Sequence, residues 1–170
     1  IYGGGRNGDE KFEITANRFT GKADVYPTGF PYTASISVYE GDFTIADNYI
    51  ETVLGDDVVE MNGIEVFGPA VARIDRNSIV GQTKGIWLSG EDVNDLDVRL
   101  QGNRIAGNDV GLDNDSVDPV MARNNWWGCN AGPGATGCDT IQGSNQNYVS
   151  YSPLLVMGIK AAPNTIYSDQ

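Results

Sequence analysis

An apolar-x-x-Asn-x-apolar pattern recurs along the chain and is the clearest sign of its organisation. The copies are Ile14–Phe19, Ile45–Ile50, Ile74–Ile79, Leu100–Ile105 and Ala122–Trp127. The intervals between them shrink towards the C-terminus but stay within the roughly 20 to 50 residues that are typical of solenoid repeats. Unequal intervals indicate loops of different length attached to a constant core.

A second short motif lies between these copies and alternates with the two-residue period of a β-strand. It occurs at Ser35–Val38, Gly63–Val66, Gly85–Leu88 and Gly111–Asn114. No stretch carries a long amphipathic helical pattern, so a helical solenoid is excluded. We predict an all-β chain that forms a right-handed parallel β-helix of about five turns. The helix is expected over residues 1–155 with a C-terminal cap, and residues 156–170 form a tail or the start of a following β-sandwich domain.

The recurring asparagine is predicted to lie at the corner between two strands of each turn. A tight corner needs a residue in the left-handed conformation, which asparagine tolerates better than other non-glycine residues. In turns stacked about 4.8 Å apart, equivalent amides also hydrogen-bond to one another or to the next backbone. The predicted corner residues are Asn17, Asn48, Asn77, Asn103 and Asn125. The apolar residues on either side of them are expected to form two stacks inside the solenoid.

Composition removes several classes of function. The chain has 170 residues with 23 acidic and 11 basic side chains, no histidine and a net charge of −12. This charge repels phosphate and opposes docking on anionic lipid, so nucleic-acid binding is excluded. No apolar stretch approaches the about 20 residues that cross a bilayer, so no membrane insertion is expected. Without histidine, catalysis would need carboxylates, Lys, Arg or Tyr.

The two cysteines, Cys129 and Cys138, lie close together in a glycine-rich loop. An even number of cysteines in an acidic chain rich in Tyr and Gly suggests an oxidising compartment, so we predict a disulfide between them. The chain starts at Ile1 without a signal-peptide pattern, and we expect a processed or excised segment of a longer precursor. These observations favour an extracellular or cell-surface location.

The C-terminal part resembles the closing turn of right-handed parallel β-helix repeat proteins. Arg123–Pro133 and Val149–Leu155 carry this resemblance. The chain is similar to the secreted or surface-anchored bacterial and archaeal members, from roughly Phe12 to Leu155. Trp126 and Trp127 are expected to plug this end of the solenoid. Ile159–Gln170 is similar to the first strand of bacterial immunoglobulin-like domains, which often follow such solenoids.

One acidic motif is similar to a motif of carbohydrate-active enzymes. Gly55–Val59 resembles a paired-aspartate motif of polygalacturonases, β-helix enzymes that use carboxylates as acid and base. The chain has no companion Asn-Thr-Asp, His-containing or Arg-Ile-Lys motif, so the acid–base system would be incomplete. Asp56 and Asp57 are therefore interpreted as a solvated turn.

A second acidic cluster consists of Asp109, Asp113, Asp115 and Asp118. Strand alternation places Asp113 and Asp115 on the same face, where carboxylates with asparagine oxygens can hold Ca²⁺. Pectate lyases of this fold use such ligands beside an Arg or Lys base, and Arg99 and Arg104 belong to the same turn here. A solvated acidic face is the default interpretation and a Ca²⁺ site at Asp113 and Asp115 is the alternative. No other cofactor is expected.

Aromatic side chains offer a candidate sugar-stacking surface, formed by Tyr26, Phe30, Tyr32 and Trp87 with Tyr39 nearby. The alternative is that these residues cover the edges of a small solenoid. Stacking explains every recurring feature and none requires chemistry, so we predict a non-catalytic structural or adhesin-like module of an extracellular surface protein. The alternative function is a fragment of a polysaccharide lyase or glycoside hydrolase, an activity common on this fold.

The N-terminal end is expected to be open. Ile1–Gly8 provides no cap comparable with the C-terminal plug, so the first turn is predicted to expose strand edges. We expect either further turns upstream or self-association at this end, in a filament or array.

Overall fold

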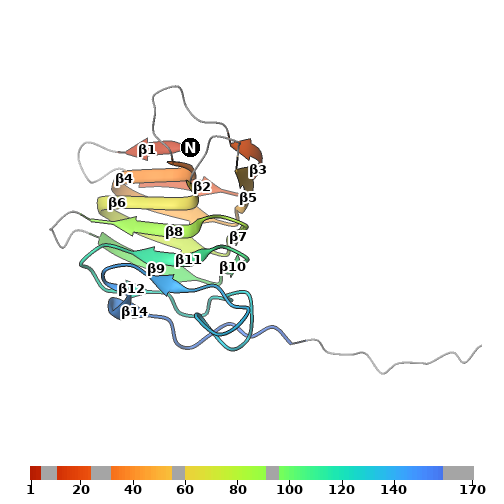
Figure 1. Cartoon of the computed structure of the whole chain (residues 1–170). Coiled ribbons are helices and arrows are strands. Elements are labelled where there is room, and N and C mark those ends of the chain that lie inside the picture. The colour runs from red at the N-terminus through yellow and green to blue at the C-terminus, as the bar shows by residue number, and fades with distance from the viewer. Residues whose placement is uncertain (5–10, 24–31, 55–59, 91–95, 159–170) are drawn as a thin grey trace, which may run out of the picture.

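The strands stack into a parallel β-solenoid of about four turns (Figure 1), which confirms the all-β solenoid prediction. The computed structural model describes residues 1–4, 11–23, 32–54, 60–90 and 96–158. Within the described ranges every strand pair is parallel, and the helical structure is a short 3-10 helix, η1, at Gln146–Tyr148. The observed number of turns, about four, is close to the about five that the sequence predicts.

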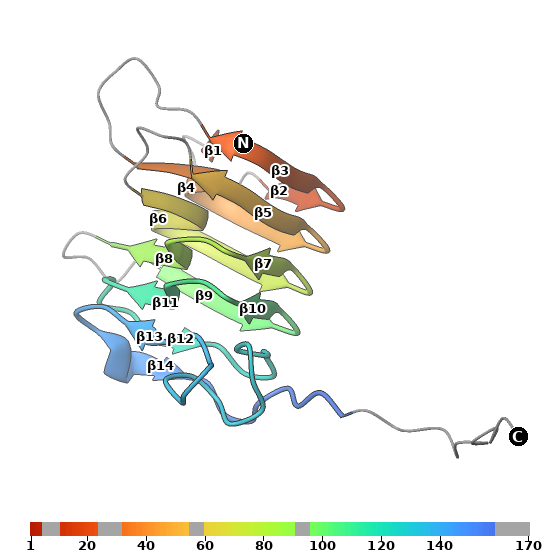
Figure 2. The same cartoon turned by 45° about the vertical axis from the view of Figure 1, so that its right-hand side comes forward.

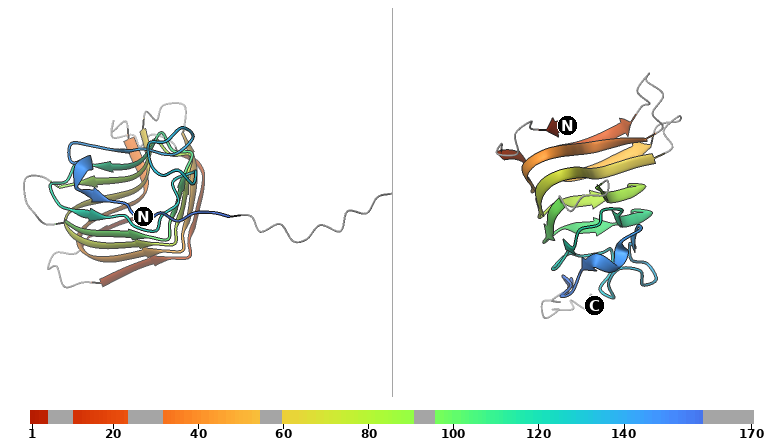
Figure 3. Two further views of the ribbon diagram at one scale, coloured as in Figure 1. Left: turned by 90° about the horizontal axis from the view of Figure 1, so that it is seen from below. Right: turned by 90° about the vertical axis from the view of Figure 1, so that its left-hand side faces the viewer.

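Each turn contributes strands to three faces. The first face contains β1 (Tyr2–Gly4), the first parts of β4 (Tyr32–Ala46) and β6 (Glu60–Asp75), then β8 (Lys84–Ser89), β11 (Val110–Asn114) and β13 (Ile141–Gln142). The second face contains β2 (Lys11–Thr15), the second parts of β4 and β6, then β9 (Leu96–Gln101), β12 (Val120–Met121) and β14 (Val149–Ser150). The third face contains β3 (Arg18–Ala23), β5 (Tyr49–Leu54), β7 (Ser78–Val80) and β10 (Arg104–Ala106), which Figure 2 shows stacked below one another. Figure 3 shows these faces around a common interior.

The register of the strands follows the repeated apolar pattern. Three buried columns run through the interior, one behind each face: Ile36, Ile64, Ile86 and Leu112; Ile14, Ile45, Ile74 and Leu100; Phe19, Ile50, Ile79 and Ile105. Phe19 is partly buried and most of the others are fully buried. Because burial of one such side chain stabilises a fold by about 1.5 to 3 kcal/mol, a one-residue slip of any strand would be costly. Both predicted stacks are confirmed.

The tight corner is placed one residue earlier than predicted. The left-handed residues are Ala16, Asp47, Arg76, Gly102 and Asn124, each of which directly precedes a repeated asparagine. The interpretation of the repeated asparagines as the left-handed residues is therefore wrong. The bend needs positive φ at the preceding position, and the asparagine itself is left free to turn its side chain inward.

The repeated asparagines form a hydrogen-bonded ladder along the solenoid. The Oδ1 atom of Asn103 accepts from the backbone N of Asn77 at 2.8 Å and from its Nδ2 at 3.1 Å. The Nδ2 of Asn103 donates to the carbonyl of Ile74 at 2.7 Å. Equivalent bonds join Asn17 to Asn48, Asn48 to Asn77 and Asn103 to Asn125. The buried amides of the ladder are thereby satisfied turn by turn.

The C-terminal end is closed by one tryptophan rather than by two. Trp127 is fully buried beneath Ile105 and belongs to the core, whereas Trp126 faces outward on the third face. The guanidinium of Arg104 lies 5.4 Å from the Trp126 ring centroid. The expectation that both rings plug the interior is corrected for Trp126, because strand alternation sends neighbouring side chains to opposite sides.

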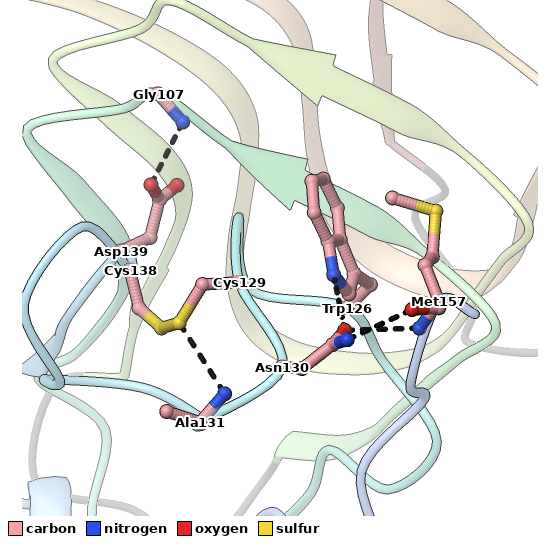
Figure 4. Close-up of a disulfide and its surroundings, with 8 residues drawn as sticks. All are labelled: Gly107, Trp126, Cys129, Asn130, Ala131, Cys138, Asp139 and Met157. Carbon is pink, nitrogen blue, oxygen red and sulfur yellow. Dashed lines mark hydrogen bonds between the residues drawn. A yellow bond between two sulfur atoms is a disulfide. The ribbon is translucent and has the colours of Figure 1, made fainter. Parts of the chain in front are cut away.

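Cys129 and Cys138 form the predicted disulfide in the closing loop (Figure 4). Next to it, Asn130 accepts a hydrogen bond from the indole of Trp126 at 3.3 Å and from the backbone N of Met157 at 2.9 Å. The loop is thus joined to the segment that leaves the solenoid. Residues 156–158 of the predicted tail are described, and residues 159–170 lie outside the described part of the chain.

Candidate functional site

The outward side of the first face gathers polar and aromatic side chains from consecutive turns. Ser37, Glu65, Trp87, Asp113 and Gln142 occupy equivalent positions on β4, β6, β8, β11 and β13. The structure therefore brings Trp87, a candidate sugar contact, next to Asp113, a candidate cation ligand. We call this row, with its neighbours Lys84 and Asp115, the Trp87 cluster.

Contacts within the cluster engage both the ring and the indole N–H of Trp87. The Nζ of Lys84 lies 4.3 Å from the ring centroid, and the Phe67 ring meets it edge-on with centroids 5.5 Å apart. The indole Nε1 donates a hydrogen bond to Asp115 Oδ2 at 3.2 Å. Cation–π and edge-to-face contacts hold an aromatic ring in a fixed orientation. Trp87 is therefore built into the face, and only part of its surface is left for a ligand.

Lys84 connects two carboxylates from different turns. Its Nζ lies 3.1 Å from Glu60 Oε1 and 3.2 Å from Asp113 Oδ2. Burial alone would lower the pKa of the Lys84 ammonium, but its hydrogen bonds with Glu60 and Asp113 outweigh burial and raise that pKa. Lys84 thus stays charged and is unsuited to act as a general base near neutral pH.

Two carboxyl groups of this face resist ionisation. Glu65 is 4% exposed, and burial raises its pKa although hydrogen bonds from Asn62 and Ser37 lower it in part. Burial also raises the pKa of Asp113, against the hydrogen bond from Lys84. Asn62 donates through Nδ2 to Glu65 Oε1 at 2.8 Å, while its buried Oδ1 has no hydrogen-bond partner within the described residues. Carboxyls of this kind can serve as general acids when a substrate reaches them.

The acidic residues of the predicted cation cluster do not converge. Asp113 and Asp115 share the outward side of the first face, but Asp115 Oδ1 accepts from the backbone N and Oγ of Ser144 at 3.0 and 3.1 Å. Burial would raise the pKa of Asp115, yet hydrogen bonds from Ser144 and Trp87 outweigh it and lower that pKa. Asp118 instead accepts from the backbone N of Leu96 at 2.9 Å, and Asp109 is exposed. Among the described residues, no three acidic or cysteine side chains form a group able to hold a metal ion.

Other predicted site residues are placed apart from the cluster or lie outside the described ranges. Arg99 on β9 faces outward on the second face and Arg104 on the third, so neither stands beside Asp113 as a lyase base would. Tyr26, Phe30, Asp56 and Asp57 fall outside the described residues. Tyr32 begins β4, where only its backbone is described.

The structure also contains a second ladder that the sequence pattern did not reveal. The backbone N of Gln82 donates to Asn108 Oδ1 at 2.8 Å, and Asn108 Nδ2 donates to Asp139 Oδ2 at 2.7 Å. Three different residue types fill equivalent positions, so no repeated letter marks them. The available signal was the glycine before Gln82 and Asn108, since Gly81 and Gly107 both have positive φ.

Comparisons with known proteins do not assign the site. No protein-family profile, curated protein or solved structure shows a significant match to this chain. Within the described residues, no helix has the length and apolar character needed to span a membrane.

Proposed function

We propose that this chain is a non-catalytic structural and adhesive β-solenoid module of an extracellular surface protein. The observation that carries the proposal is that the polar side chains bond to residues of neighbouring turns. The recurring asparagines, the second ladder and the Trp87 cluster are all engaged in contacts between successive turns. Such contacts stiffen a scaffold, and a rigid elongated surface is what a display or adhesion module requires.

The disulfide and the acidic composition support an extracellular setting. Disulfides persist in oxidising compartments and are rare in the cytosol, and Cys129 and Cys138 are bonded. The similarity of the closing turn to secreted and surface-anchored β-helix proteins supports the same location, as part of a longer bacterial or archaeal surface protein with an immunoglobulin-like domain after the solenoid. The module would contact polysaccharide through its outward faces and other copies through its first turn.

Self-association is proposed at the N-terminal end. β2 and β3 each pair with a strand on one side, and within the described residues no strand covers their other edge. β1 covers only the first part of β4, with the backbone N of Ser37 donating to the carbonyl of Ile1 at 2.8 Å. Uncovered backbone groups of a strand bind another strand unless something blocks them.

Affinity electrophoresis and activity assays on one panel of polysaccharides test this function. We expect at least one polysaccharide, when it is included in the gel, to slow the migration of the protein. In the activity assays we expect that no polysaccharide of the panel releases reducing ends or unsaturated products. Turnover of any polysaccharide in the panel, abolished by substitution of an acidic residue of the first face, would overturn the non-catalytic proposal.

A polysaccharide-degrading enzyme is the second candidate, and one observation favours it. Glu65 and Asp113 both have a raised pKa, face the same way and lie two turns apart, which is about 10 Å at the usual strand spacing. Inverting glycosidases place their two carboxyls about 6.5 to 9.5 Å apart. If Glu65→Gln and Asp113→Asn each abolish turnover while Asp109→Asn does not, this second function is correct.

A further inference from the structure

A small cavity opens on the outward side of the second face, away from the Trp87 cluster. Its volume is about 190 Å³, and it is lined by Arg99, Leu100, Gln101, Met121, Arg123 and Asn124. Arg99 and Met121 are register partners on β9 and β12. Two consecutive turns therefore form this cavity, and the stack of strands fixes its shape.

Neither arginine of the cavity forms an ion pair within the described residues, although the charge of Arg99 helps to lower the pKa of the nearby Asp97 carboxyl. Arg73, Arg76 and Lys84 are ion-paired with carboxylates. Within the described part of the chain, by contrast, Arg99 makes no hydrogen bond or ion pair, and Arg123 reaches only Ser150 Oγ at 3.4 Å. No carboxylate lines the cavity. Two unpaired guanidinium groups thus share one cavity in a chain whose net charge is −12.

We propose that this cavity binds one carboxylate-bearing sugar unit. The guanidinium fork matches a carboxylate through two parallel hydrogen bonds, and two arginines line this one cavity. The amides of Gln101 and Asn124 are suited to sugar hydroxyls, and Met121, which is 37% exposed, offers an apolar contact for a sugar ring. The volume lies below the roughly 300 to 1,000 Å³ of pockets for drug-sized ligands, so a single ring is the fitting size.

The surrounding charges select a ligand with one negative charge rather than a polyanion. Asp97, two residues before Arg99 on the same strand, is held by Arg73 through Oδ1 and Oδ2 at 3.1 and 2.7 Å. Asp75 opposes Gln101 on the neighbouring strand. A densely charged chain would meet these carboxylates and the acidic protein as a whole, whereas a single acidic sugar unit within the cavity brings one negative charge to the two arginines. The inference goes beyond the proposed function, because it assigns a site and a ligand class on a different face.

Titration with glucuronate, with glucose and acetate as controls, tests this site. By calorimetry at low ionic strength, we expect glucuronate to bind more tightly than acetate and glucose not to bind. Arg99→Gln and Arg123→Gln should each weaken glucuronate binding by at least about tenfold, since each removes a charged bidentate contact. Arg18→Gln is the matched control, because that guanidinium lies over Tyr49 on the third face, 4.3 Å from the ring centroid.

Three results would overturn the proposal. They are no binding of glucuronate, glucuronate binding that neither cavity substitution weakens, and acetate binding as tightly as glucuronate, which would mean recognition of carboxylate without the sugar. Circular dichroism establishes that each variant is folded. If a glutamine variant fails to fold, Arg99→Lys and Arg123→Lys keep the charge but lose the fork, and they are still expected to weaken binding. Turnover of a polysaccharide would contradict the structural-module proposal, whereas the glucuronate titration tests only the cavity. Failure of one proposal can therefore be told from failure of the other.

Discussion

Asp139 Oδ2 lies 2.7 Å from Asn108 Nδ2 and accepts a second hydrogen bond from the backbone N of Asn108 at 3.2 Å. Its other oxygen accepts from the backbone N of Gly107 at 2.8 Å (Figure 4). One carboxylate therefore provides acceptors for three donors at the end of the second ladder. Because Asp139 follows Cys138 directly, the disulfide loop delivers this carboxylate to the last turn.

Replacement of Asp139 by leucine is expected to destabilise the fold by roughly 2 to 4 kcal/mol, because three donors lose their acceptor where little water can replace it. Asp139→Asn retains one acceptor and should cost less. Chemical denaturation measures both changes, with the exposed Asp109→Asn as the control. Equal, small effects of Asp139→Leu and Asp109→Asn would contradict the role given to this carboxylate.

Reduction of the disulfide is expected to lower the free energy of unfolding by about 2 to 3 kcal/mol, the chain-entropy value for a loop this short. Mass spectrometry of protein isolated without reductant should find Cys129 bonded to Cys138. The double variant Cys129→Ser, Cys138→Ser should lose the same stability as reduction does. Two free thiols in the isolated protein would contradict both the bond and the extracellular location.

Substitution of a central ladder asparagine should be more harmful than substitution of the first one. Asn103→Leu removes an acceptor from Asn77 and a donor from the Ile74 carbonyl, all buried, and is expected to cost roughly 2 to 4 kcal/mol. Asn17→Leu, at the partly exposed start of the ladder, should cost about 1 kcal/mol. Thermal or chemical denaturation compares them, and identical losses would mean that the ladder does not act turn by turn.

Glu65 gives the pH dependence of stability a predictable sign. Because its pKa in the folded state is raised by burial, its favourable contribution is complete below its unfolded pKa and is lost as the pH rises through the folded value. Glu65→Gln removes that loss, so the variant should gain stability relative to the wild type as the pH rises above the unfolded pKa of a glutamate, about 4.3. Thermal denaturation across this range measures the difference.

Asp97 supplies the control with the opposite sign. Its hydrogen bond with Arg73 lowers its pKa, so its contribution is present above the unfolded pKa and is lost as the pH falls through the folded value. Asp97→Asn should therefore be more harmful near neutral pH than in acid. A Glu65→Gln variant that behaves in the same way as Asp97→Asn would show that the pKa of Glu65 is lowered, not raised, in the folded protein.

Self-association through the first turn predicts concentration-dependent particles in solution. Small-angle scattering and light scattering of the chain should show a mass that rises with protein concentration, because strand pairing between copies follows mass action. A mass that stays at that of one chain over the whole concentration range is the contrary outcome.

The fold could be predicted because the interior of a solenoid requires the same spacing in every turn. Ile45, Ile74 and Leu100 lie in one stack, and each precedes the repeated asparagine of its own turn by three residues. Because the stack requires this constant number of residues, the sequence shows it as a repeat. The left-handed residue of the corner was predicted one position too late. That position holds Ala, Asp, Arg, Gly or Asn in different turns, so no repeated residue type marks it in the sequence.

The side-chain networks could not be predicted for a related reason. Lys84, Glu60 and Asp113 belong to three different turns whose loops differ in length, and nothing in their local sequence shows that they meet. The same holds for the cavity formed by Arg99 and Arg123, which depends on the register of β9 against β12. The sequence indicated which residue types were available, and only the stacking order determined which of them became neighbours.

The asparagine ladder is directional, and this restricts how molecules can join at the N-terminal end. In each bond between two side chains of the ladder, the Nδ2 of one asparagine donates to the Oδ1 of the asparagine in the following turn. Asn17 is therefore left with an Oδ1 that receives no donor within the described residues. Two copies related by a two-fold axis at this end would bring two such oxygens face to face, and they would repel. A turn added in the same direction would instead bring an amide that donates to Asn17. The row of amides therefore favours a further turn stacked in the same direction over a closed symmetric pair.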